Sequence, residues 1–351
     1  DYTWEPPRTL PRTAIYHPAH ASPELKDWQA DWQPGYPVAA LLFYRSHLQA
    51  ANTAFVDVFC QRMQAAGLNP LPIAVASLKE PGCLANVEDW LDEVDAAVIL
   101  NTTGFAQSSP EAPHLRPFRR NIPVIQAICA QDNEPGWRDS EQGLGPRDLA
   151  MHIALPELDG RIISRPISLK DLAWRSERSQ SDVVCYRAQP ERMDFVAQLA
   201  RRWVELARVP NPQKRIALIL ANYPTRDGRI GNGVGLDTPA AALNILRALQ
   251  ARGYPLDCRL PESGTALIQD LLGGVSNDLD SLDLRPCMQS LALDEYWTMF
   301  NRLPEANRQA VIERWGMPET DPMFRSGRLM VAGLRFGLTF VGIQPARGYQ
   351  V

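Results

Sequence analysis

The chain has 351 residues, of which 45% are hydrophobic and 22% are charged, and its formal net charge is -4. These values are near the average for globular proteins, so they exclude long disordered stretches, and the length predicts two or three hydrophobic cores. The slightly acidic balance argues against general nucleic-acid binding, which needs a basic face. The sequence shows no apolar run long enough to span a membrane and no signal peptide, and we expect a cytoplasmic protein.

The six cysteines are widely spaced and form no C-x-x-C pair. Four of them lie in or beside apolar segments, which favours buried reduced thiols over disulfides or a zinc site. His17 and His20 form an H-x-x-H pair, but Pro18 between them disfavours the helix that would place both imidazoles on one face. We therefore do not expect a metal site at this pair.

The first 35 residues are rich in proline, tryptophan and polar side chains, and they predict an extended arm that wraps a neighbouring element. Residues 36–160 then alternate between apolar strands and helices, which predicts a first α/β lobe with a parallel sheet covered by helices. The expected strands are residues 38–44, 71–75, 96–100 and 123–128, and the expected helices are residues 53–66 and 84–91.

Residues 161–212 predict a connecting segment, because apolar residues recur at helical spacing from 190 to 209 before two prolines. Residues 213–351 predict a second α/β lobe. Its expected elements are a strand at 216–221, a helix ending near Arg252, helical structure over 294–315 and a small two-stranded β unit over 328–343. The predicted fold is thus α/β, with two Rossmann-like or flavodoxin-like lobes and a connecting helix.

The chain begins at Asp1 without a methionine and stops directly after an expected sheet element. These two features predict that the chain is an excised piece of a longer protein. They also predict that the second lobe is truncated at its C-terminal end.

A polar, glycine-rich loop over residues 222–239 joins the strand and the helix of the second lobe. Asp237 or Thr238 can cap that helix, and Pro239 suits its first position. In such units the loop lies at the carboxyl edge of the sheet, where ligands bind, and glycines let backbone N–H groups approach a ligand closely. The loop is therefore the leading candidate for a binding site, and a long surface loop built from turn residues is the alternative.

The glycine spacing of this loop matches neither of the familiar phosphate-binding motifs. Gly231, Gly233 and Gly235 give G-x-G-x-G instead of the dinucleotide pattern G-x-G-x-x-G, and no Lys-Ser or Lys-Thr pair follows them. The chain has four lysines, and none of them ends a G-x-x-x-x-G run. We predict that this polypeptide does not hydrolyse ATP by a P-loop mechanism.

Four separated blocks carry a family resemblance: PVAALLFYRSHLQAANT from residue 37, IALPELDG from 153, NYPTRDGRIGNG from 222 and FVGIQPARGY from 340. In these blocks the chain resembles the large-subunit family of aerobic cobaltochelatase (CobN), which is related to the porphyrin-binding H subunit of magnesium chelatase. The loop from residue 222 resembles the cobalt branch, whereas the magnesium branch usually has a lysine-containing loop there.

The resemblance implies the tetrapyrrole-binding large subunit of an ATP-dependent metal chelatase, a ligase that forms nitrogen–metal bonds. For the cobalt branch it implies insertion of cobalt, the substrate metal, into hydrogenobyrinic acid a,c-diamide in cobalamin (vitamin B12) biosynthesis. ATP and Mg would be used by separate AAA+ ATPase partner subunits, CobS and CobT, which agrees with the lack of a P-loop. The alternatives are a magnesium chelatase H subunit acting on protoporphyrin IX, a non-catalytic binding fragment, and a nucleotide-dependent α/β enzyme.

Metal insertion removes two pyrrole protons and strips water from the metal, and a carboxylate or imidazole at the macrocycle centre can serve both steps. Glu157 is the best candidate for proton acceptor or transient metal ligand, and Asp159 is a second candidate metal ligand. The alternative is that both residues only shape a turn. His47 is the second catalytic candidate, because an imidazole can accept a proton near pH 7, and a structural role is its alternative.

Arginine grips carboxylates through two parallel hydrogen bonds, which suits a tetrapyrrole that bears several carboxylates. Arg226 and Arg229 flank Asp227, and this pattern predicts a clamp for ligand carboxylates in which the aspartate orients the arginines; an ordinary solvated loop is the alternative. The remaining substrate-binding candidates lie in the same loop or in other resemblance blocks, and they are Arg45, Asn222, Gly231, Gly233, Gln344 and Arg347.

Members of the resembled family are several times longer than this chain. After the last block they continue into a segment of the form H-G-x-L-E-x-x-P-G-K, which this chain lacks. We therefore expect that half of the metal site lies outside the chain and that the isolated fragment is inactive.

Overall fold

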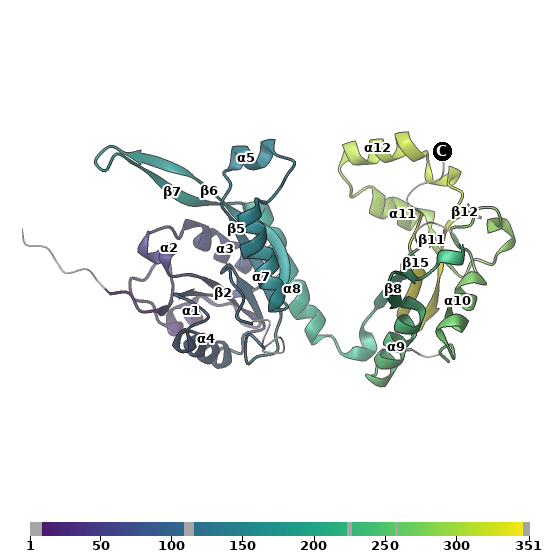
Figure 1. Cartoon of the computed structure of the whole chain (residues 1–351), viewed down its shortest axis with the longest axis horizontal. Coiled ribbons are helices and arrows are strands. Elements are labelled where there is room, and N and C mark those ends of the chain that lie inside the picture. The colour runs from purple at the N-terminus through teal and green to yellow at the C-terminus, as the bar shows by residue number, and fades with distance from the viewer. Residues whose placement is uncertain (1–8, 109–115, 223–226, 257–258, 347–351) are drawn as a thin grey trace, which may run out of the picture. The chain divides into compact units, whose positions relative to one another are not determined.

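The computed structural model describes residues 9–108, 116–222, 227–256 and 259–346. The chain divides into two compact units, Asp1–Arg208 and Val209–Val351, whose elements are labelled in Figure 1. Within the described ranges, no helix combines the length and the apolar character needed to cross a membrane.

A seven-stranded sheet forms the centre of the first unit, in the order β1-β3-β2-β4-β5-β6-β7. The five inner strands run parallel, and the two edge strands β1 and β7 run antiparallel to their neighbours. The inner order is the flavodoxin-like order 2-1-3-4-5, which reverses between β2 and β4. In sequence order the strands are Thr13–Ile15, Val38–Tyr44, Asn69–Val75, Val98–Asn101, Val124–Ala130, Ile162–Ser176 and Ser181–Ala188.

Largely apolar runs explain the inner strands other than β6, because a strand that is covered on both faces needs apolar side chains in both directions. Helices α3 (Ala54–Ala65) and α4 (Pro81–Glu93) follow β2 and β3. The right-handed crossover rule places these two helices on opposite faces of the sheet, since their connections run in opposite directions along it. The smaller helical segments of this unit are α1 (Leu25–Asp31), α2 (Ser46–Gln49), α5 (Glu134–Asp139), α6 (Pro146–Leu149), α7 (Leu155–Leu158) and a π-helical turn at Ala150–Ala154.

Helix α8 (Pro190–Arg208) packs against α3 and the sheet. It buries one face through Met193, Val196, Ala197, Ala200 and Val204, which recur at helical spacing. Together with β6 and β7 it completes the first unit, whereas the sequence assigned residues 161–212 to a connecting segment. The boundary between the units therefore follows Arg208.

The described part of the N-terminal arm is also folded into the first unit. β1 pairs with β3, and α1 buries Leu25 and Trp28. The indole N–H groups of Trp28 and Trp32 donate to the carbonyl oxygens of Tyr16 and Pro70, at 2.6 Å and 2.9 Å. These tryptophans anchor a segment that was expected to be extended.

The second unit contains a parallel strand pair, β8 (Ile216–Leu220) and β15 (Thr339–Ile343), extended by the antiparallel strand β14 (Gly333–Phe336). A second three-stranded sheet contains β11 (Gln289–Ala292), β12 (Phe324–Arg325) and β13 (Arg328–Val331), and a short hairpin contains β9 (Asn232–Gly233) and β10 (Leu236–Asp237). The main helices are α9 (Thr238–Ala251), α10 (Gly264–Leu272), α11 (Leu293–Phe300) and α12 (Glu305–Trp315).

Two expectations for the end of the chain were wrong in detail. Residues 328–343 form three strands in two sheets, because the chain changes sheets at Gly333, where an added Cβ would lie 2.5 Å from the Phe340 ring. The helical stretch 294–315 is divided into α11 and α12, because Pro304 precedes the second helix and cannot continue the first.

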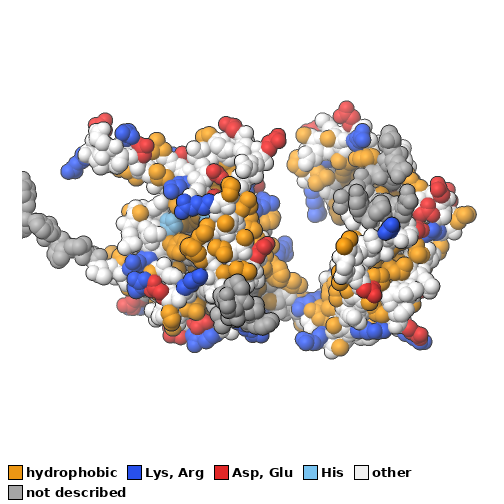
Figure 2. Space-filling model, viewed as in Figure 1, with side chains coloured by type: hydrophobic (Ala, Val, Ile, Leu, Met, Phe, Trp, Pro, Cys, Tyr) orange, Lys and Arg blue, Asp and Glu red, His pale blue; other side chains and the backbone are white. Residues whose placement is uncertain are grey.

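Acidic and basic side chains are mixed over the visible face of each unit, as Figure 2 shows. That face offers no broad basic area of the kind that nucleic-acid binding needs.

Candidate functional site

The loop after β8 and the segment after β15 meet, because these two strands are parallel neighbours whose carboxyl ends lie at one edge. The backbone N–H of Gln344 donates to the carbonyl oxygen of Leu220 at 2.9 Å. Asn222 is buried and forms an isolated antiparallel bridge with Ile230, and the N–H of Gly231 donates to the carbonyl directly after β8 at 2.7 Å. The structure thus brings the predicted site residue Gln344 to Asn222 and Gly231, which lie more than a hundred residues earlier in the sequence.

The Asp227 side chain is bound by Ser276 and Arg285, whereas the sequence analysis predicted that Asp227 orients Arg226 and Arg229. Its carboxylate accepts a hydrogen bond from the Ser276 hydroxyl at 2.7 Å and pairs with the Arg285 guanidinium at 2.6 Å. Arg229 is exposed, and Arg226 lies outside the described residues. The described contacts of Asp227 therefore anchor the loop. Arg285 has no local signal in the sequence, because it is 58 positions away from Asp227.

Asn277 holds the segment after β15 through two hydrogen bonds. Its amide nitrogen donates to the carbonyl of Gln344 at 2.8 Å, and its amide oxygen accepts from the N–H of Ala346 at 3.2 Å. Arg347, the next predicted binding residue, lies outside the described residues. The side chain of Gln344 remains half-buried at this edge, beside the loop from residue 222.

The local geometry explains why glycine is needed at two predicted binding positions, Gly231 and Gly233. Gly231 has a φ of +69°, a conformation that other residues rarely adopt. An added Cβ at Gly233 would lie 2.9 Å from the Thr238 hydroxyl, so the β9–β10 hairpin could not pack this closely on the start of α9. Both glycines therefore shape the loop, and a backbone that is bent in this way also exposes N–H groups.

A pocket of about 710 Å³ borders the segment after β15. Its volume lies in the range of small-molecule sites. Its lining is mainly apolar and aromatic, and it comprises Tyr296, Val311, Trp315, Gly316, Met317, Pro318, Asp321, Met323, Leu329, Met330, Pro345 and Ala346.

In the first unit, the two predicted carboxylates have different environments. Glu157 is exposed at the end of α7, and among the described residues no hydrogen bond or ion pair joins its side chain to another group. The Asp159 side chain is completely covered and lies 2.6 Å from the Arg161 guanidinium. It also accepts hydrogen bonds from the N–H groups of Gln107 and Ser108, at 3.0 Å and 2.8 Å.

These contacts decide the charge state of Asp159. Burial raises the pKa of Asp159, but the hydrogen bonds from Ser108 and Gln107 and the charge of Arg161 together hold the pKa below its ordinary value. Because its oxygens are already used, Asp159 would have to break structural contacts to bind a metal. Among the described residues, no group of three or more His, Cys, Asp or Glu side chains could hold a metal ion.

Arg161 belongs to a buried polar network that the sequence analysis missed. Its guanidinium donates to the carbonyl oxygens of Thr103 and Phe105 and to the side-chain oxygen of Gln126, at 3.1 Å, 2.9 Å and 3.0 Å. Asn101 donates to the same oxygen of Gln126 at 2.9 Å. The available signal was a glutamine within the apolar strand β5.

Arg45 and His47 follow β2, as predicted, but both side chains face the protein. The Arg45 guanidinium donates to the carbonyl of Leu10 at 3.0 Å and so holds the N-terminal segment. His47 is buried against the rings of Phe55 and Tyr186, with centroids 5.0 Å and 5.3 Å away. Burial lowers the pKa of His47 to about 4, so the imidazole is neutral at pH 7.

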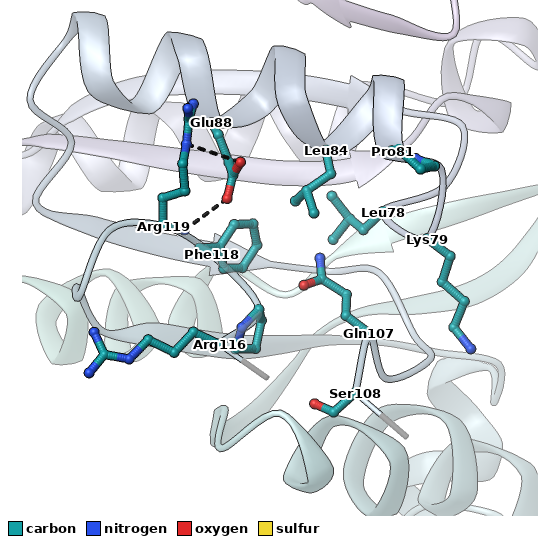
Figure 3. A pocket seen from close by; sticks show the side chains of 11 residues that line it. Leu78, Lys79, Pro81, Leu84, Glu88, Gln107, Ser108, Arg116, Phe118 and Arg119 are labelled. Carbon is teal, nitrogen blue, oxygen red and sulfur yellow. Dashed lines mark hydrogen bonds and ion pairs between the residues drawn. The ribbon is translucent and has the colours of Figure 1, made fainter. Parts of the chain in front are cut away.

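The carboxyl ends of β2, β3 and β4 border two pockets of about 660 Å³ and 120 Å³. The strand order reverses between β2 and β4, and such a reversal is where open α/β sheets bind ligands. Figure 3 shows Leu84 and Glu88 of α4 on one wall of the larger pocket, with Gln107 and Phe118 facing them. Glu88 accepts from the backbone N–H of Arg119 at 2.8 Å and pairs with its guanidinium at 3.1 Å.

Comparison with known proteins assigns the chain to a family. The sequence matches the family described as CobN/Magnesium Chelatase over residues 1–351. The chain therefore belongs to the CobN/magnesium chelatase family, and its named relatives include cobaltochelatase and magnesium-chelatase subunits.

Three relatives illustrate the similarity. The aerobic cobaltochelatase subunit CobN of Pseudomonas aeruginosa is 74% identical over 351 residues, which are 100% of this chain and 28% of that protein. The subunit of the same name from Sinorhizobium sp. is 37% identical over 99% of this chain and 28% of its own length. The solved catalytic subunit of cobaltochelatase from Mycobacterium tuberculosis has a TM-score of 0.70 and 30% identity, and covers 99% of this chain and 28% of that one.

The structural similarity confirms the predicted α/β fold class. The chain spans 28% of the length of each of these relatives. It is similar to one part of a cobaltochelatase subunit.

Proposed function

We propose that this chain is part of the tetrapyrrole-binding large subunit of a cobaltochelatase. The complete subunit inserts cobalt into hydrogenobyrinic acid a,c-diamide in cobalamin biosynthesis, in the cytoplasm. AAA+ ATPase partner subunits, CobS and CobT, hydrolyse ATP with Mg and drive the insertion. The 74% identity to a protein named as an aerobic cobaltochelatase subunit supports the choice of cobalt.

The observation that carries the proposal is the meeting of two resemblance blocks at one edge of the second unit. The loop from Asn222 and the segment from Gln344 lie together at the carboxyl ends of β8 and β15. That segment also borders the pocket of about 710 Å³, which has a mainly apolar and aromatic lining. Arginines of the loop, Arg226 and Arg229, bind the peripheral carboxylates in this proposal.

Glu157 accepts the pyrrole protons or transiently binds the metal in this proposal. Its exposure and its lack of a partner among the described residues leave the carboxylate available for this chemistry. His47 is the second candidate base. It is uncharged at pH 7, as a proton acceptor must be, but it would have to become accessible first.

Three other functions remain as alternatives. A magnesium chelatase H subunit acting on protoporphyrin IX belongs to the same family. A nucleotide-dependent α/β enzyme is supported by the flavodoxin-like strand order of the first unit, which is an argument from fold analogy. A binding fragment without catalytic activity is consistent with the 28% coverage of the relatives.

One experiment separates these possibilities. The complete subunit and its ATPase partners are incubated with ATP, with cobalt or magnesium, and with the corrinoid or protoporphyrin IX. We expect ATP-dependent insertion only for cobalt with the corrinoid, and no ATP turnover by the 351-residue chain alone, since it lacks a P-loop. Magnesium insertion into protoporphyrin IX would favour the H-subunit alternative, and ATP turnover by the isolated chain would favour the nucleotide enzyme.

A further inference from the structure

Gln107 lies between the two pockets at the carboxyl edge of the first unit and lines both of them. Its backbone is fixed, because its N–H donates to both oxygens of Asp159 at 3.0 Å. Its side chain extends from this fixed point toward Leu84 and Phe118 of the larger pocket (Figure 3). The Asp159–Arg161 pair thus positions a side chain at the place where the strand order reverses.

The side-chain amide of Gln107 is covered from solvent, and neither its nitrogen nor its oxygen has a hydrogen-bond partner among the described residues. Such groups are rare in folded proteins, because a covered polar group without a partner is destabilising. The amide contrasts with that of the nearby Gln126, whose oxygen and nitrogen are both bonded. Gln107 therefore has one unused acceptor and one unused donor group beside a pocket.

The surroundings of Gln107 indicate what would satisfy it. The pocket walls are apolar at Leu78, Leu84 and Phe118. Lys79 and Arg116 are exposed at the larger pocket, and no ion pair joins either of them to an acidic side chain within the described ranges. The pocket thus combines apolar walls, exposed positive charge and one unpaired amide.

A carboxamide is the natural complement of the Gln107 amide, because it offers one acceptor to the Gln107 NH₂ and one donor to its oxygen. An ionised carboxylate offers acceptors only and would leave the Gln107 oxygen unpaired. Lys79 and Arg116 can bind carboxylates that flank the carboxamide. This pattern fits a ligand with carboxamide and carboxylate groups on one edge.

We propose that Gln107 is a specificity residue that binds a carboxamide side group of the corrinoid, with Lys79 and Arg116 binding adjacent carboxylates. The inference rests on the proposed function, in which the substrate is an acid that carries amides at its a and c positions. The Gln107 side chain already points toward the larger pocket, and in this proposal a small side-chain rotation exposes its covered amide to the substrate. The same residue favours macrocycles that carry a carboxamide over macrocycles that carry carboxylates alone.

The test compares hydrogenobyrinic acid with its a,c-diamide, using the complete subunit and absorbance titration. The variants are Gln107→Leu, which removes the amide, and Gln107→Glu, which replaces it with an acceptor-only group. Gln61→Leu is the matched control, because Gln61 is exposed on α3 and lines none of the pockets described above. Thermal unfolding of each ligand-free variant is measured in parallel.

We expect Gln107→Leu to weaken binding of the diamide by roughly tenfold while binding of the acid is unchanged, since two hydrogen bonds are lost with only one ligand. Its melting temperature should equal or exceed that of the wild type, because the substitution removes an unpaired polar group. Gln107→Glu should reduce the preference for the diamide further, and Gln61→Leu should change nothing.

An unchanged ratio of the two affinities in Gln107→Leu would overturn the inference and leave the proposed function intact. A lower melting temperature with an unchanged ratio would show that Gln107 is structural. Failure of the wild-type subunit to bind either corrinoid would refute the proposed function, and the inference with it.

Discussion

The Asp159 carboxylate lies 2.6 Å from the Arg161 guanidinium, and the two side chains are almost completely removed from solvent. Removing one member of such a pair leaves an uncompensated buried charge. We expect Asp159→Asn to lower the free energy of unfolding of the first unit by about 3–5 kcal/mol, as measured by denaturant unfolding.

Asp182→Asn is the matched control for that substitution, because Asp182 pairs with Arg175 on the surface and both side chains are more than half exposed. Its effect should stay within about 0.5 kcal/mol. If Asp159→Asn instead abolished cobalt insertion without affecting stability, Asp159 would be a metal ligand, as the sequence first indicated.

Glu157→Gln should abolish metal insertion by the complete subunit and leave tetrapyrrole affinity within about tenfold, because the change removes a base but keeps the shape. The exposed position of Glu157 predicts no loss of stability. Steady-state insertion and absorbance titration measure the two effects. Glu141→Gln, an exposed residue of the same unit, is the control, and insertion at the normal rate in Glu157→Gln would show that Glu157 only shapes the turn.

Asp227→Ala and Arg229→Ala should separate anchoring of the loop from ligand binding. Asp227→Ala removes the contacts that join the loop to Arg285 and Ser276, so it should destabilise the loop by about 1–3 kcal/mol and increase hydrogen exchange over residues 227–237. Arg229 is exposed, and Arg229→Ala should change stability by less than about 0.5 kcal/mol while it weakens corrinoid binding. Equal exchange in Asp227→Ala and the wild type would contradict the anchoring role.

His47 should make the first unit less stable in acid. Its folded pKa of about 4 lies below the ordinary value of 6.5, so between these values the unfolded chain binds a proton that the folded chain does not. The stability associated with neutral His47 is therefore complete above about pH 6.5 and falls as the pH decreases toward 4, by roughly 3 kcal/mol in total. His47→Phe, which keeps the aromatic packing, should flatten this dependence, and an identical pH profile in both proteins would exclude His47 as its source.

Sequence reasoning succeeded where structure follows from local pattern. The strand expected at 38–44 matches β2, because a continuous apolar run has few other stable solutions. The parallel pairing of β15 with β8, which brings Gln344 to the loop from Asn222, was not predicted, because residues 328–343 were expected to form a separate two-stranded unit. β6 was missed, because it contains Arg165, Lys170 and Asp171 among its apolar residues.

The chemistry of individual side chains was harder to foresee. The sequence cannot show that His47 is surrounded by Phe55 and Tyr186, because burial depends on elements that are far apart in the chain. The pairing of Asp227 with Arg285 likewise has no periodic signature. The sequence does not distinguish Gln107 from other loop glutamines. Only the three-dimensional structure shows that its covered side-chain amide has no hydrogen-bond partner among the described residues.

The pairing of β8 with β15 has a consequence for the synthesis of the protein. Leu220 and Ile343 are paired, although more than a hundred residues separate them. At translation rates of about 5–20 residues per second, β15 leaves the ribosome on the order of ten seconds after β8. During that interval the apolar edge of β8 is available to other nascent chains, so β15 should be required for recovery of soluble protein as well as for the fold.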